Sequence, residues 1–367
     1  VLRGISCGDF PAPAAITALS DDDDLYEAFN ALLERGVLSA PVYSASLRRF
    51  TGFIDAGDLV TFILHMHGDG SIASRIETLK TMLAHLVAVV PTLVSSVANL
   101  SRNNPFHGVA PEEPLSKVAV MLASACSHGY RLHRVPVLAP PPHAAAEEGA
   151  GPVLTNVITQ SALLAFVAAP GRARRDHPAL KGVLEDTTVA AACGGAFIKP
   201  VATVRATDSI IEAFKLMRDH GISGVGVTDA GSGALVDCVT NSDVLPTVLN
   251  KSHSADGFDF IETNALAFVA LARASRWRVR HTSAATARAG AGAGGGAGGT
   301  GAGGGEAGEE GEAAPSSLVT VRETATLGEV MDALVSNRVH RVFVVDAAGM
   351  AVGVVSIKDL LAALLDG

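Results

Sequence analysis

The sequence has little of what several functional classes require. Basic residues are the minority, with 28 Lys and Arg against 37 Asp and Glu and a formal net charge of −9. A protein that binds nucleic acid without sequence preference needs a net basic surface, so this balance argues against that class. Neither a P-loop pattern (GxxxxGK[ST]) nor a nucleophile-elbow pattern (GxSxG) occurs. The four repeats described below account for nearly every apolar run, so we expect no enzymatic activity.

Cysteine is also scarce. The four cysteines, Cys7, Cys126, Cys193 and Cys238, include no CxxC pair and have no nearby histidine at ligand spacing. This favours reduced, buried thiols in an intracellular protein over a disulfide framework or a zinc site. We expect the cytoplasm, with the nucleus as an alternative. Because the sequence begins with Val1, an organelle address stays open.

Long apolar runs without polar residues are missing as well. The stretch from Thr81 to Ser101 carries no charge, but it contains His85, Pro91, Ser95, Ser96 and Asn99. A membrane-spanning helix needs about 20 predominantly apolar residues, and these polar groups would lie deep in the bilayer. The stretch therefore predicts a buried helix and a connector, and no membrane association.

Glycine is frequent but confined. Of the 38 glycines, 13 lie between Gly290 and Gly311, in a tract that otherwise consists largely of Ala and Glu. Such a composition cannot bury enough apolar surface to fold. We therefore predict a disordered linker over residues 285–316.

One pattern occurs four times outside that tract. An amphipathic helix is followed by an apolar strand, a turn, a second apolar strand and a polar tetrapeptide that opens another helix. The first helices are predicted at Leu25–Leu33, Leu115–Ala125, Ile210–Met217 and Leu327–Leu334. The tetrapeptides are Asp55–Asp58, Thr159–Ala162, Thr240–Asp243 and Ser356–Asp359. We place the repeats at 14–66, 106–168, 197–250 and 317–366, with repeats 1 and 2 as one module and repeats 3 and 4 as another.

The tetrapeptide lies where a nucleotide could bind. A helix start has unpaired backbone N–H groups and a dipole that favours an anion, and a Thr or Ser hydroxyl such as Thr240 or Ser356 can assist there. A carboxylate three residues later, as at Asp58, Asp243 and Asp359, can accept hydrogen bonds from a ribose diol. The plain alternative is helix capping.

A His-Arg pair occurs once in each module. His133-Arg134 and His340-Arg341 precede the first strand of repeats 2 and 4, whereas Leu38-Ser39 and Ser223-Gly224 stand at the equivalent places in repeats 1 and 3. Arginine supplies forked donors that suit phosphate, and histidine adds a hydrogen bond or part of a charge. Alternatively, these are surface charges at strand edges.

The repeat resembles the cystathionine-beta-synthase (CBS) domain, and the four-copy chain resembles the gamma regulatory subunit of the AMP-activated and sucrose-non-fermenting protein kinases, including plant and algal relatives. The strongest matches are Arg131–Val137, Val339–Asp346 and Gly353–Asp359, within a resemblance that runs from about Ala14 to Leu365. It implies an α+β fold in which two tandem CBS pairs form a disk. It also implies an adenine nucleotide (AMP, ADP or ATP) as ligand, and the catalytic and scaffold subunits of a protein kinase as partners.

The resemblance carries over unevenly to the single residues. It implies that Asp58, Asp243 and Asp359 hold ribose, while Ala162 leaves repeat 2 without a carboxylate, as in the second repeat of the kinase subunits. Asp55 replaces the hydroxyl residue of repeat 1 and would repel phosphate, so repeats 3 and 4 are the better site. Two hypotheses remain: a nucleotide-sensing regulatory subunit, or an interaction scaffold that keeps the fold and has lost its ligand.

Overall fold

The computed structural model describes residues 2, 4–13, 15–67, 92–123, 132–141, 151–169, 177–198, 200–248, 259–275 and 318–366. Within these residues, every repeat has the predicted order of elements. Repeat 1 contains α1 (Leu25–Glu34), β2 (Ser39–Ser44), β3 (Arg49–Asp55) and α2 (Ala56–His67), and repeat 2 contains α4 (Leu115–Ala123), β4 (Arg134–Ala139), β5 (Val153–Thr159) and α5 (Gln160–Ala168). Repeat 3 contains α7 (Ile210–Asp219), β7 (Gly224–Thr228), β8 (Leu235–Thr240) and α8 (Val244–Val248), and repeat 4 contains α10 (Leu327–Ser336), β10 (Arg341–Val345), β11 (Ala351–Ser356) and α11 (Ile357–Asp366). The predicted linker, 285–316, lies outside the described residues.

Each repeat builds its sheet in the same way. The two predicted strands pair antiparallel, and each pair has a register shift near the end of its first strand. A third, parallel strand that the sequence did not predict joins in three repeats: β1 (Leu19–Ser20), β6 (Thr203–Arg205) and β9 (Thr320–Val321). In repeat 2 an isolated parallel bridge from Val109 to Val137 takes this place. The same irregularity in all four copies supports their common origin as one structural unit.

The helices form for local reasons. In α1, Leu25, Ala28, Phe29 and Leu32 are buried along one face, at the spacing of an amphipathic helix. Asp24, the last of four consecutive aspartates, caps this helix by accepting hydrogen bonds from the backbone N–H groups of the second and third helical residues. The acidic residue before the helix therefore satisfies backbone donors that the helix itself leaves unpaired.

Sheets face one another within each module. In the first, the Phe106 ring lies between Phe50 and Phe53, with ring centroids 5.6 and 5.3 Å apart. In the second, the Leu235 backbone N–H donates to the Gly349 carbonyl across the two hairpins at 3.0 Å. Repeats 1 and 2 thus form one pair and repeats 3 and 4 the other, as predicted.

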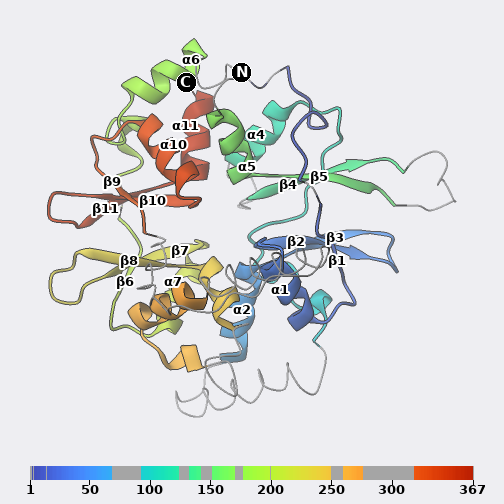
Figure 1. Cartoon of the computed structure of the whole chain (residues 1–367), viewed down its shortest axis with the longest axis horizontal. Coiled ribbons are helices and arrows are strands. Elements are labelled where there is room, and N and C mark those ends of the chain that lie inside the picture. Colours follow the sequence, from blue (N-terminus) through green and yellow to red (C-terminus); the bar gives the residue numbers. More distant parts are fainter. Residues whose placement is uncertain are drawn as a thin grey trace, which may run out of the picture.

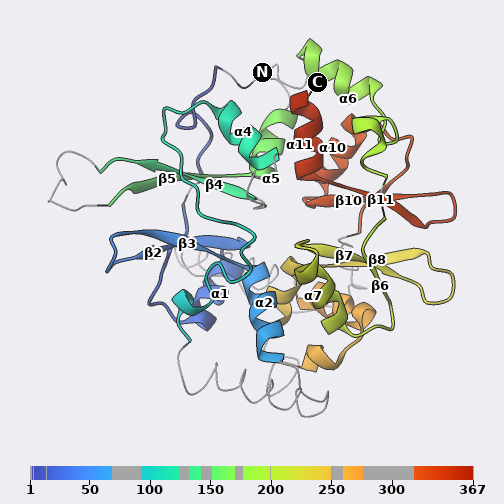
Figure 2. The ribbon, with the colours of Figure 1, turned by 180° about the vertical axis from the view of Figure 1, so that it is seen from behind.

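Helices join the two modules. One hydrophobic core combines buried side chains of repeats 1 and 3, where α2 packs against α7 and α8, and a second combines repeats 2 and 4, where α4 packs against α11 and α5 against α10. The four repeats therefore occupy the quadrants of a flattened disk (Figures 1 and 2). Each core belongs to both modules, so neither module buries its helices alone.

Three further observations bear on the sequence expectations. The segment between repeats 2 and 3 contains a helix that was not predicted, α6 (Pro178–Asp186), which packs against α10. Cys7 and Cys238 are buried thiols that form no disulfide, as expected. Residues 81–91 of the uncharged stretch lie outside the described residues, and 92–101 form turns around a short 3-10 helix at Val94–Ser96. Among the described helices, none is long and apolar enough to cross a membrane.

Candidate functional site

The polar tetrapeptides lie where they were predicted, between the second strand and the second helix of each repeat. In repeats 3 and 4 the first and last residues of the tetrapeptide bind each other. Asp243 Oδ2 accepts from the backbone N–H and hydroxyl of Thr240 at 2.7 and 2.6 Å, and Asp359 Oδ2 accepts from the same groups of Ser356 at 2.9 and 2.6 Å. Both motifs therefore cap their helices, and one oxygen of each carboxylate is engaged in the cap.

Repeat 1 makes the same cap with two carboxylates. Asp58 Oδ2 accepts from the Asp55 backbone N–H at 2.9 Å, and Asp55 Oδ1 accepts from the N–H groups of Gly57 and Asp58 at 2.8 and 3.1 Å. The other Asp58 oxygen accepts from the Ser101 N–H at 2.8 Å. Burial, and then the nearby Asp55 carboxylate, raises the pKa of Asp58 to about 7. Both oxygens of the predicted ribose ligand Asp58 are thus engaged by backbone donors.

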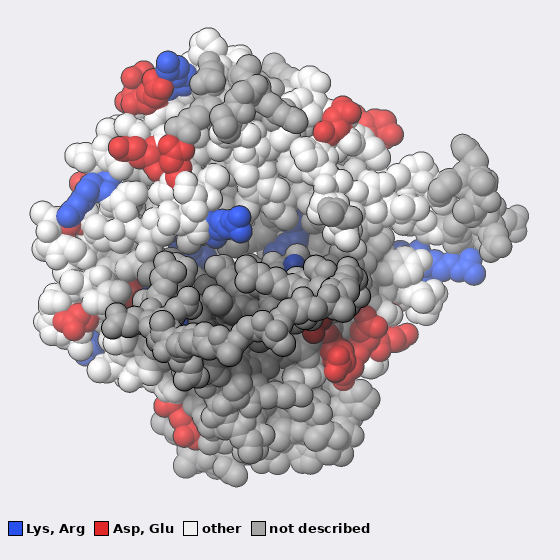
Figure 3. Space-filling view, in the orientation of Figure 1, with Lys and Arg blue, Asp and Glu red and all other residues white. Residues whose placement is uncertain are grey.

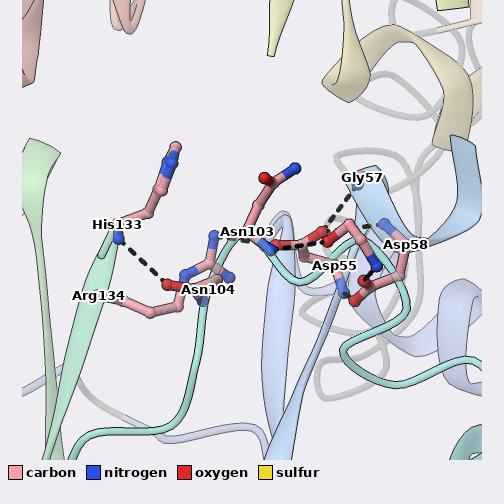
Figure 4. Close-up of polar contacts among 8 residues, drawn as sticks. Asp55, Gly57, Asp58, Asn103, Asn104, His133 and Arg134 are labelled. Atoms are coloured by element: carbon pink, nitrogen blue, oxygen red, sulfur yellow. Dashed lines mark hydrogen bonds and ion pairs between the residues drawn. The ribbon is translucent and has the colours of Figure 1, made fainter. Parts of the chain in front are cut away.

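Arg134 of repeat 2 reaches across the module to repeat 1 (Figure 4). Its Nη2 lies 3.9 Å from Asp55 Oδ2, and its guanidinium carbon lies 5.6 Å from the centre of the Phe53 ring. Burial lowers the pKa of Arg134, whereas Asp55 and Asp58 raise it. Its Nε and Nη1 make no hydrogen bond within the described part of the chain. The predicted phosphate donor therefore already faces a carboxylate of the protein.

Arg341 of repeat 4 reaches across the second module to the Ser223 hydroxyl of repeat 3. Its Nη2 donates to the Ser223 hydroxyl, and its guanidinium lies over Gly224, where an added Cβ would be 2.2 Å from Nη1. Burial lowers the pKa of Arg341, whereas Cys238 and Asp243 raise it. Among the described residues no ion pair joins Arg341 to a carboxylate. In the strand pairing, Arg341 lies directly opposite Ser356.

The two histidines differ in their surroundings. The backbone N–H of His133 donates to Asn104 Oδ1 at 3.1 Å, and its ring points away from the Arg134 guanidinium (Figure 4). The pKa of His340 is lowered to about 4, first by desolvation from the surrounding protein and then by Arg341 and Arg134. His340 is therefore neutral near pH 7. Because the charges of Arg134 and Arg341 both lower the pKa of His340, the arginines of the two modules face a common central region.

The structure brings together residues that the sequence had no means to associate. Ser101 and Asn104, in the connector before repeat 2, contact Asp58 and His133. Asn241 of repeat 3 lies against Gly57 of repeat 1, where a Cβ would be 3.1 Å from its Nδ2. No spacing in the sequence marks these contacts, because they join different repeats.

Basic and acidic side chains are distributed differently over the surface of the molecule. Figure 3 shows Lys and Arg side chains near the middle of one face, between the upper and lower halves, while most visible Asp and Glu lie nearer the rim.

A surface pocket between α6 and α10, lined in part by Lys181 and Asp332, lies away from the predicted site. Within the described residues, no group of three His, Cys, Asp or Glu side chains is arranged as a metal site.

Comparison with known proteins agrees with this geometry. The CBS domain family matches residues 195–250 and 314–366, which cover the third and fourth repeats. Repeats 3 and 4 are thus similar to CBS domains. The described fold of the chain is also that of a protein from Methanocaldococcus jannaschii, proposed as an archaeal homologue of the gamma subunit of AMP-activated protein kinase, with a TM-score of 0.60 at 13% identity over 95% of this chain and 96% of the other.

Curated relatives of this chain include kinase gamma subunits. The 5'-AMP-activated protein kinase subunit gamma of Dictyostelium discoideum is 22% identical over 366 residues, which is 100% of this chain and 52% of that protein. The SNF1-related protein kinase regulatory subunit gamma-1-like of Arabidopsis thaliana is 27% identical over 277 residues, 74% of this chain and 48% of that protein. The chain thus resembles gamma subunits, and it spans about half the length of these relatives.

Proposed function

We propose that this chain is a non-catalytic regulatory subunit that binds an adenine nucleotide (AMP, ADP or ATP) between repeats 3 and 4. Occupancy of this site modulates a partner protein kinase in response to energy supply. The kinase assignment rests on the resemblance to gamma subunits. The nucleotide assignment rests on the residues around Arg341.

The observation that carries the proposal is the environment of Arg341. Its guanidinium is largely enclosed and contacts the Ser223 hydroxyl, and although Asp243 acts on it electrostatically, no carboxylate of the described residues pairs with it at ion-pair distance. Such a group suits an oxyanion such as phosphate, since forked donors match its geometry. The helix starts at Thr240 and Ser356 add backbone N–H groups, and the neutral ring of His340 adds a hydrogen-bonding group.

We assign the ribose hydroxyls to the carboxylates of Asp243 and Asp359. Because Oδ2 of each carboxylate binds its own Thr240 or Ser356, the carboxylates are already positioned before a ligand arrives. Capping and ribose binding are thus compatible roles of one side chain. In repeat 1, backbone donors engage both oxygens of Asp58.

Calorimetry with AMP, ADP and ATP tests the nucleotide site. A hydrogen bond to a charged group contributes roughly 1.5–3 kcal/mol, so Arg341→Ala should weaken binding about ten- to a hundredfold. Arg205→Ala, an exposed arginine at the edge of the same module, is the matched control and should bind normally. If the intact protein binds none of the three nucleotides at millimolar concentration, the sensing proposal fails and the scaffold hypothesis replaces it.

A kinase assay tests the regulatory role. The chain should be reconstituted with the catalytic and scaffold subunits of an AMP-activated or SNF1-related kinase, and activity measured with and without AMP. We expect a nucleotide response that Arg341→Ala removes and Arg205→Ala retains. Assembly without any nucleotide response would support the scaffold hypothesis.

A further inference from the structure

Repeat 1 differs from the other three repeats at a single decisive position. The last residue of the second strand is Thr159, Thr240 or Ser356 in repeats 2, 3 and 4, and Asp55 in repeat 1. All four begin a helix in the same way, with the side chain accepting from backbone N–H groups or closing a capping box. A hydroxyl is therefore sufficient for capping, and the extra negative charge of Asp55 needs another explanation.

The charge of Asp55 faces the arginine of the opposite repeat. Arg134 Nη2 lies 3.9 Å from Asp55 Oδ2, and both side chains are mostly enclosed, with exposed fractions of 13% and 16%. In the second module the equivalent arginine, Arg341, meets the neutral hydroxyl of Ser223. A tetrapeptide aspartate acts electrostatically on the arginine of each module, Asp58 on Arg134 and Asp243 on Arg341. Among the described residues, the first module differs because it places a further carboxylate, Asp55, beside its arginine.

An internal carboxylate in this position competes with a ligand phosphate in two ways. It provides Arg134 with a permanent negative partner, and it places a like charge where a phosphate would have to lie. The second carboxylate of the cap, Asp58, adds to this, although its raised pKa shows that the surroundings already disfavour two full charges. A nucleotide entering here would have to displace the ion pair and meet an acidic helix start.

We infer that Asp55 is a built-in counter-ion that occupies Arg134 in place of a phosphate and closes the module of repeats 1 and 2 to nucleotides. It is a specificity-determining residue, so binding is restricted to the module of repeats 3 and 4. This inference deepens the proposed function and rests on it for the type of ligand. The first module thus retains an arginine, Arg134, whose Nε and Nη1 make no hydrogen bond within the described residues. Substitution of Asp55 alone would make this guanidinium available to a phosphate.

The experiment is a gain of binding. Asp55→Thr restores the residue of repeats 2 and 3, retains a cap and frees Arg134. It should be combined with Arg341→Ala, which removes the proposed site, so that any new binding belongs to the first module. Calorimetry with AMP should show the Asp55→Thr/Arg341→Ala protein binding about ten- to a hundredfold more tightly than Arg341→Ala alone.

Two controls separate charge from shape. Asp55→Glu/Arg341→Ala keeps a carboxylate and should bind no better than Arg341→Ala. Adding Arg134→Ala to Asp55→Thr/Arg341→Ala should abolish the gain, with circular dichroism establishing that each variant is folded. The inference is overturned if Asp55→Thr adds no AMP binding, or if the added binding survives Arg134→Ala. Failure of the proposed function would look different, because then Arg341→Ala would leave the AMP affinity of the otherwise unchanged protein as it was.

Discussion

The ion pair between Asp237 of β8 and Arg273 should respond asymmetrically to removal of its two partners. Arg273 lies in the helical segment 265–275, whose Phe268 packs edge-on against Phe214 of α7 with ring centroids 5.6 Å apart. The pair therefore ties this segment to the sheet of repeat 3. Asp237 is 4% exposed, whereas Arg273 is 29% exposed.

The magnitudes follow from this difference in burial. Removing one partner of a buried ion pair costs about 3–5 kcal/mol, because the other charge is left uncompensated. Arg273→Met keeps much of the apolar stem and leaves the Asp237 carboxylate buried, so it should lie in that range. Asp237→Asn leaves Arg273 able to contact water and should cost about 1–2 kcal/mol, near one charge-assisted hydrogen bond. Repeat 2 shows that the amide fits, since Asn156 at the equivalent place accepts from the Val157 N–H at 2.8 Å.

Urea unfolding of both single variants and the double variant measures these costs and their coupling. Burial raises the pKa of Asp237 above its usual value, and loss of Arg273 should raise it further. The folded state of Arg273→Met then binds more protons than the unfolded state, so its stability should fall as pH rises from about 4 upward. An equal or larger loss in Asp237→Asn, or a cost of Arg273→Met that does not depend on pH, would refute this reasoning.

Two further predictions concern the capped helix starts and their arginines. Gly224→Ala should displace the Arg341 guanidinium and crowd the Val239 carbonyl, which lies 2.9 Å from the added Cβ. Thermal denaturation should therefore show a loss of stability of about 1–3 kcal/mol, and calorimetry an AMP affinity as weak as that of Arg341→Ala. Unchanged AMP affinity would contradict the placement of this arginine. Because the pKa of Asp58 is raised to about 7, the folded state takes up a proton below that pH and the protein should lose stability as pH rises from about 4 to 7. Asp58→Asn should flatten this part of the stability profile in urea titrations at several pH values, and an unaltered slope would show that other groups cause it.

The sequence by itself determined the repeat and its elements. The spacing of apolar residues predicted the helix beginning at Leu327 and the strand beginning at Arg341, because burial of one helical face or of a short apolar run leaves a periodic record in the chain. Capping is equally local, so the helix starts at Thr240 and Ser356 were found from four consecutive residues. The positions of the repeats also grouped them into two modules, and the resemblance to CBS domains then added the disk.

Only the tertiary structure decided what each polar side chain faces. The sequence marked Arg134 and Arg341 as equivalent, yet one lies against Asp55 and the other against Ser223, since their partners come from other repeats. The connector residue Asn104 left no periodic signal, whereas the unpredicted helix α6 carries a single i, i+3, i+4 set, Leu180, Val183 and Leu184, that the sequence analysis missed. Partners across a module are brought together by packing of whole sheets and helices, and charge pairing depends on distances of a few ångströms that no one-dimensional pattern encodes.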